Sequence, residues 1–139
     1  MNDARMTATA ALLLRVALGT MFVAHALLKY FVFTLPGTAQ FFGSLGLPPV
    51  LGYVTFAVEL VGGVMLVLGV QTRAVALALV PVMIGATWAH AGNGWLFSAA
   101  NGGWEYPAFW TVTLLVQALL GDGAYALRRP QSVPALQRA

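Results

Sequence analysis

The sequence predicts an all-α fold, a bundle of four transmembrane helices with both termini on the cytoplasmic side. Three observations carry this prediction: 60% of the 139 residues are hydrophobic, only 8% are charged, and the apolar residues gather in long stretches. An ordinary soluble domain has roughly a quarter charged residues, and a domain this short exposes too much surface to hide so many apolar side chains. Lipid can cover the apolar side chains that a core this small cannot bury.

Four stretches are long enough to cross a bilayer, which takes about 20 mostly apolar residues for roughly 30 Å of hydrocarbon. They cover about residues 8–33, 50–70, 74–91 and 105–127, and a short tail follows over residues 128–139. The Gly- and Pro-rich segment after the first stretch contains a short interfacial helix over about 38–45. We expect a single transmembrane domain over residues 1–139. We expect no signal cleavage after Ala26, because Arg15 splits the preceding apolar run.

The basic residues predict the orientation, because cytoplasmic segments carry an excess of Lys and Arg. With four crossings, one side of the membrane collects nearly all of them, and the other side holds Lys29. The residues on the basic side are Arg5, Arg73, Arg128, Arg129 and Arg138, with Arg15 nearest to it. We therefore expect a multi-pass protein of the bacterial plasma (inner) membrane with both termini in the cytoplasm.

Composition also excludes several classes of function. Cysteine is absent, which excludes structural disulfides, thiolate metal sites and thiol–disulfide relays. The seven basic residues are scattered along an apolar chain and form no basic face, so nucleic acid is not an expected partner. No flavin, NAD or haem motif and no self-contained catalytic motif is present, so whether the chain is itself an enzyme stays open.

Two charged residues that lie well inside the first and second predicted spans are expected to pair. Counting residues from the cytoplasmic ends places the backbones of Arg15 and Glu59 within about 6 Å of each other in depth. A charge facing lipid costs at least ~2.5 kcal/mol, so we expect the two side chains to form an ion pair inside the bundle. Such a pair either locks the first two spans in register or forms a protonatable or ligand-binding site.

A second polar group is expected near the outer surface. His25 and Lys29 share one face of the first span at a spacing of four residues, His90 ends the third span, and Glu105 opens the fourth. Together these side chains could carry protons or hold an anionic or quinone headgroup. In the alternative interpretation they only cap helices and bond within the interface. We expect no metal or haem here, since Lys29 repels cations and the two histidines differ in depth.

Several short motifs occur in a characteristic order between Arg15 and Arg129. They are Arg15-x-x-x-Gly19, Lys29, Phe42-Gly43-Ser44-Leu45-Gly46-Leu47-Pro48, Glu59-x-x-Gly62-Gly63, Leu68-Gly69-x-x-Thr72-Arg73, Gly102-Gly103-Trp104-Glu105-Tyr106-Pro107 and Gly121-Asp122-Gly123-Ala124. In this order and spacing the sequence resembles the DoxX family of small four-helix membrane proteins. The charged positions of that pattern match Arg15, Lys29, Glu59 and Glu105.

The resemblance implies a role beside redox enzymes. The family takes its name from the membrane subunit of a thiosulfate:quinone oxidoreductase, and other members are linked with oxidative-stress complexes or amine dehydrogenase maturation. It implies an accessory, quinone-facing membrane subunit, with quinone as the expected cofactor and a redox protein as the expected partner. A membrane scaffold or assembly factor is the alternative, and a small transporter a third reading. Association with further copies of the chain is also open.

Overall fold

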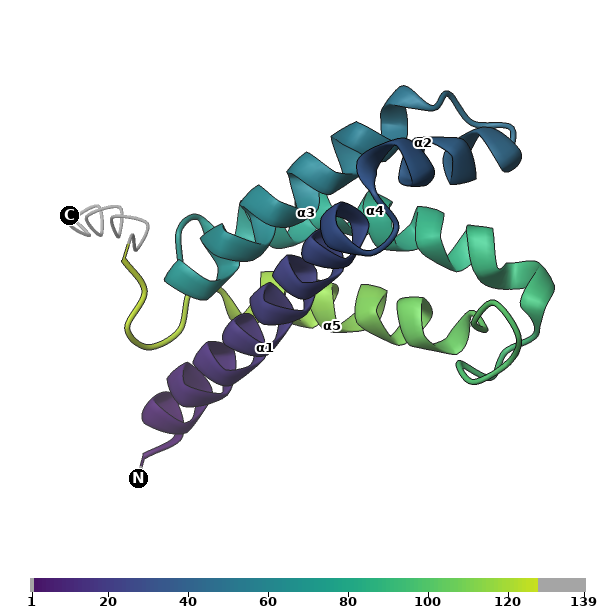
Figure 1. Cartoon of the computed structure of the whole chain (residues 1–139). Coiled ribbons are helices and arrows are strands. Elements are labelled where there is room, and N and C mark those ends of the chain that lie inside the picture. The colour runs from purple at the N-terminus through teal and green to yellow at the C-terminus, as the bar shows by residue number, and fades with distance from the viewer. Residues whose placement is uncertain (1, 128–139) are drawn as a thin grey trace, which may run out of the picture.

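The computed structural model describes residues 2–127, and this part of the chain is helical without a strand. The elements are α1 (Asp3–Phe31), α2 (Leu35–Ser44), α3 (Val50–Leu68), α4 (Thr72–His90), the short 3-10 helix η1 (Ala91–Asn93) and α5 (Glu105–Leu120). Figure 1 shows the four long helices as a bundle, with the short α2 beside the start of α3. The all-α prediction is confirmed for these residues, and the expected tail over 128–139 lies outside them.

The two ends of the bundle differ (Figure 1). The start of α1, the turn between α3 and α4 and the segment after α5 lie at one end, called here the terminal end. Helix α2 and the loop between α4 and α5 lie at the opposite end, called here the loop end. Both ends of the described chain are therefore on the same side of the bundle, an arrangement that an even number of crossings requires.

Three segments are long and apolar enough to cross a membrane. They are Asp3–Phe31, Val50–Leu68 and Thr72–Asn93, with mean hydropathies of 1.9, 2.0 and 1.7. Most of their surface is not covered by the rest of the chain, and large apolar side chains point outward along it, among them Leu13, Val61, Leu77 and Ile84. In water such a surface would drive aggregation, whereas lipid solvates it.

Helix α5 ends earlier than the sequence predicts, at Leu120 rather than near residue 127. The backbone turns at Gly121 and Gly123, with φ of 81° and 72°, a region that residues with a Cβ atom rarely adopt. Gly123 also lies against α1, where a Cβ atom would come within 2.7 Å of the Ala11 Cβ. The chain after Leu120 thus leaves the helix and packs on α1.

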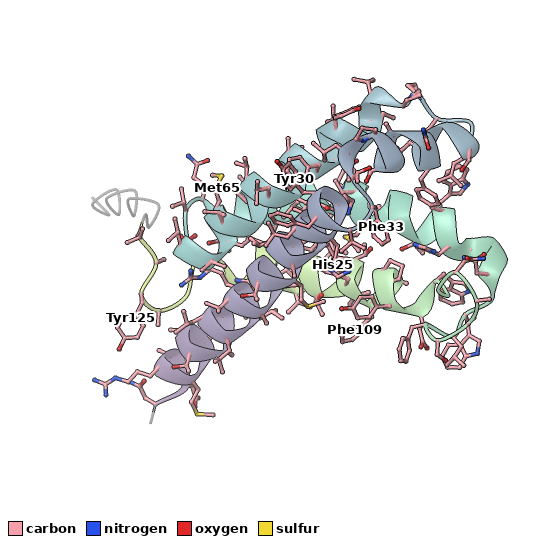
Figure 2. All side chains as sticks on the ribbon, in the orientation of Figure 1. His25, Tyr30, Phe33, Met65, Phe109 and Tyr125 are labelled. Atoms are coloured by element: carbon pink, nitrogen blue, oxygen red, sulfur yellow. The ribbon has the colours of Figure 1, made fainter. Side chains whose placement is uncertain are left out.

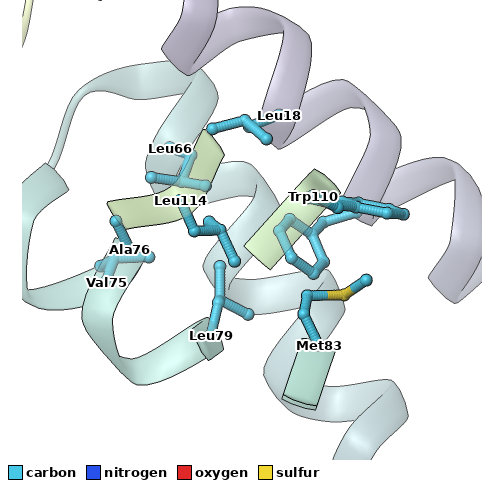
Figure 3. Close-up of a cluster of buried hydrophobic side chains, with 9 residues drawn as sticks. Leu18, Leu66, Val75, Ala76, Leu79, Met83, Trp110 and Leu114 are labelled. Carbon is cyan, nitrogen blue, oxygen red and sulfur yellow. The ribbon is translucent and has the colours of Figure 1, made fainter. Parts of the chain in front are cut away.

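The core is formed by side chains from all four long helices (Figure 3). Phe22 and Trp110 make its aromatic part, with ring centroids 4.6 Å apart. Aliphatic side chains and Met83 complete it; the full set is Leu18, Phe22, Leu66, Val75, Ala76, Leu79, Met83, Trp110 and Leu114. Because lipid tails are as apolar as these side chains, the core contributes close packing rather than a hydrophobic driving force.

Helices α1 and α3 touch backbone to backbone at Gly19 and Gly63. A Cβ atom on Gly19 would lie 2.6 Å from the Gly63 carbonyl oxygen, and one on Gly63 would lie 2.9 Å from the Gly19 carbonyl oxygen. Small residues permit this approach, which is a common way for helices to associate in membranes. Gly85 on α4, by contrast, has open space around it among the described residues.

The terminal end of α3 is completed by residues from elsewhere in the chain. The last four carbonyls of a helix lack intrahelical partners. Here Val70 N–H donates to Met65 O, Gly69 N–H to Leu66 O, and Leu127 N–H to Leu68 O. The Arg15 guanidinium supplies the rest: Nη1 donates to Leu66 O at 3.0 Å and to Val67 O at 2.6 Å.

Arg15 also binds the segment that follows α5. Its Nη2 donates to Ala124 O at 2.9 Å, and the side chain is 1% exposed. The guanidinium charge lies at the negative end of the α3 dipole, where a cation is favoured. A single arginine therefore ties α1 to the end of α3 and to the end of the described chain.

We expect Gly19→Ala to destabilise the bundle, because the new methyl group would push against the α3 backbone. Forcing a methyl group into a packed contact costs about 1–3 kcal/mol. Gly85→Ala is the matched control, since a methyl group there meets nothing within 4 Å. Thermal unfolding of both variants in the same detergent checks this. Equal melting temperatures would show that the Gly19–Gly63 contact is loose.

We expect Arg15→Met to destabilise the protein by about 2–5 kcal/mol, because the carbonyls of Val67 and Ala124 would lose the donor that Arg15 supplies. Arg15→Lys should rescue little, since an ammonium group cannot reproduce the planar fork of donors. Arg5→Met, at an exposed arginine of the same helix, is the control. Unfolding followed by tryptophan fluorescence measures all three, and an Arg15→Met protein as stable as the control would contradict the proposed role.

Candidate functional site

A partly buried ion pair joins α1 and α3 in the half of the bundle nearer the loop end. Lys29 Nζ lies 2.6 Å from Glu59 Oε2, and the two side chains are 18% and 7% exposed. Lys29 is in the last turn of α1, and Glu59 is in the middle of α3. A charge in the membrane must be paired or reach water, and each of these charges neutralises the other.

His25 lies one turn before Lys29 on the same helix face. Its Nδ1 is 2.9 Å from Met21 O. Because a carbonyl only accepts, we assign the proton of the neutral imidazole to Nδ1, and Nε2 is then an acceptor. The ion pair therefore has an imidazole one turn away on α1, with Nε2 left as an acceptor.

Two aromatic rings from α5 pack against the His25 imidazole. The Trp110 ring centroid is 4.9 Å from the imidazole in an edge-on arrangement, and the Tyr106 centroid is 6.4 Å away and stacked. Figure 2 shows His25 on α1 where that helix meets α5. In the last turn of α1, the Tyr30 ring stacks on the Phe56 ring of α3, with centroids 6.0 Å apart. Flat apolar rings thus flank the polar side chains.

The Trp110 indole N–H has no acceptor among the described residues. Trp110 is 3% exposed, and its Nε1 is buried without a hydrogen-bond partner. Buried N–H groups in native proteins are rarely left this way, and each such case calls for an explanation. Lys29 likewise has two N–H groups beyond the one that Glu59 accepts. The site therefore combines spare donors, a histidine acceptor and ring surfaces.

The predicted ion pair between Arg15 and Glu59 does not form. Arg15 is level with Leu66 and Val67, whereas Glu59 lies about 10 Å from Leu66 along α3 at 1.5 Å per residue. The count along the sequence assumed that both helices begin at the same depth. In the structure α1 runs on past the end of α3, so Arg15 meets the last turn of α3. Lys29 is the side chain that reaches Glu59.

The predicted outer cluster of four residues is also divided. Lys29 pairs with Glu59 and His25 lies one turn before it on α1, whereas His90 and Glu105 form hydrogen bonds in the loop between α4 and α5. His90 Nδ1 is 3.4 Å from Asn93 Nδ2, and Glu105 Oε1 accepts from Phe97 N–H at 3.0 Å. No hydrogen bond or ion pair within residues 2–127 links either of them to His25 or Lys29.

Tyr106 and Trp110 were missed as site residues, because aromatic residues near a helix end look like an interfacial belt. Their spacing carries the signal that could have placed them. Residues four apart share one helix face, as His25 and Lys29 do on α1. Two such pairs near the same end of antiparallel helices can meet, and here His25 faces both rings.

We expect Lys29→Met to cost more stability than replacing both partners. The single variant leaves the Glu59 carboxylate buried and unpaired, which costs about 3–5 kcal/mol, whereas an apolar replacement of a whole pair is often neutral. A double-mutant cycle of Lys29→Met, Glu59→Met and the combined variant, read as melting temperatures, tests this. Additive losses would mean that the two side chains do not depend on each other.

Comparison with known proteins places the chain among its relatives. The DoxX family model matches residues 10–92, more than half of the chain. "Putative oxidoreductase CatD" of Bacillus subtilis (strain 168) is 47% identical over 75 residues, and the match covers about half of each protein, 54%. An "Uncharacterized protein" of Haemophilus influenzae (strain ATCC 51907 / DSM 11121 / KW20 / Rd) is 33% identical over 116 residues, 82% of this chain and 84% of that protein. No solved structure matches. The predicted resemblance is confirmed: this multi-pass membrane protein belongs to the DoxX family.

Proposed function

We propose that this protein is the membrane subunit of an oxidoreductase system and that it binds a quinone headgroup beside the Lys29–Glu59 pair. The observation that carries the proposal is the buried Trp110 N–H, which has no acceptor among the described residues, on a ring that packs against His25, one turn before Lys29 on α1. A quinone headgroup is a flat ring with two carbonyl oxygens that only accept hydrogen bonds. Lys29 and Trp110 offer donors for such oxygens, and the Trp110 and Tyr106 rings offer flat surfaces.

Access from the lipid supports the same ligand class. The Lys29 side chain is not sealed, at 18% exposed, and its surroundings are apolar helix surface such as Phe31 and Val32. A ligand dissolved in the bilayer can approach there without crossing water. A quinone, with a polar ring on an isoprenoid chain, fits this route better than a charged metabolite does.

The electrons would come from another protein. The chain contains no cysteine and carries no recognisable flavin, NAD or haem motif. The name of the Bacillus relative, an oxidoreductase, favours a redox setting. The role proposed here is therefore to hold the quinone in the membrane while a partner subunit carries the redox group.

We further propose four crossings, with α5 as the fourth and the terminal end in the cytoplasm of a bacterium, at the inner membrane. Support comes from exposed Arg5 and Arg73 at the terminal end. The loop between α4 and α5, at the opposite end, contains no charged residue from Ala91 to Trp104.

We expect quinone to co-purify with the gently solubilised protein. In Lys29→Met/Glu59→Met we expect the quinone content per protein to fall about tenfold or more. Loss of one hydrogen bond to a charged group costs about 1.5–3 kcal/mol, which corresponds to that factor. Trp110→Phe should also weaken retention, because it removes the N–H and keeps a ring. Gly85→Ala is the control that should retain quinone fully. Extraction followed by mass spectrometry gives the quinone content per protein.

The competing function is a scaffold or assembly factor without a small ligand. It is favoured by the polar side chains inside the bundle whose hydrogen bonds only hold parts of the chain together, above all Arg15 with its three carbonyl partners. Wild-type protein that carries no quinone in several detergents, while a protein partner stays bound in native mass spectrometry, would overturn the quinone proposal and support the scaffold.

A further inference from the structure

The loop between α4 and α5, residues 91–104, presents a compact apolar surface. Trp95, Leu96 and Phe97 are adjacent in sequence and 61%, 45% and 63% exposed. Trp104 at the end of the loop is also exposed. No charged residue occurs in the loop, although surface loops are usually the most polar part of a protein. Its exposed side is therefore poorly suited to water.

The loop is closed on itself by hydrogen bonds. Trp104 N–H donates to Gly94 O and Glu105 N–H to Trp95 O, which ties its two arms together. Asn93 Nδ2 donates to Asn101 O at 3.2 Å and to Gly102 O at 2.8 Å, and Glu105 accepts from Phe97 N–H. Irregular backbone can enter a membrane only where its polar groups are satisfied internally. Much of this loop meets that requirement.

The length of α5 leaves room for the loop in the bilayer. Helix α5 has 16 residues and spans about 24 Å, which is about 6 Å short of the roughly 30 Å of hydrocarbon. Its terminal end is polar: Asp122 Oδ1 accepts from Thr72 N–H, and the Arg73 guanidinium lies beside Gly121. That end belongs at the water surface, so the missing length falls at the loop end.

The helices that the loop connects also expose large apolar side chains. Ile84 and Trp88 on α4 and Phe109 on α5 are all exposed, the last at 69%. Figure 2 shows Phe109 on the outer side of α5. Tryptophan and tyrosine favour the boundary between headgroups and acyl chains, and Trp88, Trp95, Trp104 and Tyr106 gather near this end.

We infer that the loop lies in the lipid interface and that Trp95, Leu96 and Phe97 reach the acyl chains of the leaflet at the loop end. The occupant of this surface is lipid rather than water or a protein partner. The loop then supplies the apolar thickness that α5 lacks. This inference rests on the fourth crossing proposed above and not on quinone binding.

The absence of cysteine makes the test direct, since one introduced cysteine gives one labelling site. Phe97→Cys and the control Arg5→Cys, at the exposed terminal end, are spin-labelled in liposomes. Collisions with oxygen, which concentrates in lipid, and with a water-soluble nickel chelate are then measured. We expect the ratio of oxygen to nickel accessibility at residue 97 to be several times that at residue 5. Equal ratios would overturn the inference.

A third position separates this inference from the proposed crossing. Tyr125→Cys, 86% exposed at the terminal end, is labelled in sealed vesicles with a membrane-impermeant maleimide. If residues 5 and 125 react from the same side, α5 crosses, and a nickel-accessible residue 97 overturns the loop inference alone. If they react from opposite sides, the four-crossing proposal fails and the loop inference falls with it. If residue 97 is shielded from both reagents, a protein covers the loop and the lipid inference is wrong.

Discussion

The end of α3 imposes the strongest constraint on this fold. A helix whose last carbonyls are covered by other parts of the chain must find donors within the protein, because the covering residues keep water away from them. The chain meets this need with the turn after α3, with Leu127 N–H and with Arg15. Since these donors come from three separate parts of the sequence, the terminal end of the bundle forms as one unit.

Polar contacts and a close backbone contact also fix the register of α1 against α3. Arg15 is bound at one end of their contact, Lys29 is bound to Glu59 toward the other, and the Gly19–Gly63 approach lies between them. A shift of one helical turn, about 5.4 Å, would break the polar ties and drive side chains into the backbone contact. Arg15, the Lys29–Glu59 pair and one pair of glycines therefore define a single alignment.

The sequence predicted what depends on composition and missed what depends on relative depth. Helical content, the family and the start of α5 at Glu105 followed from apolar stretches and local motifs. The pairing of Arg15 with Glu59 was wrong because residue counts cannot tell how far one helix projects beyond its neighbour. The end of α5 at Leu120 was missed because the predicted span ran through Gly121-Asp122-Gly123 to the apolar residues 124–127, whereas the chain turns at these glycines and packs on α1.

The three carbonyl partners of Arg15 also order events during synthesis. When α1 leaves the ribosome, Leu66 and Val67 are still more than 50 residues away, and Ala124 is 109 residues away. Since chain synthesis proceeds at about 5–20 residues per second, the last partner of Arg15 is made several seconds after the arginine itself. Until then Nη2 of Arg15 depends on lipid headgroups or on the insertion machinery for a partner. The terminal end of the bundle is completed only when Ala124 is made, so a product truncated before Ala124 retains an arginine that its own helices satisfy only in part.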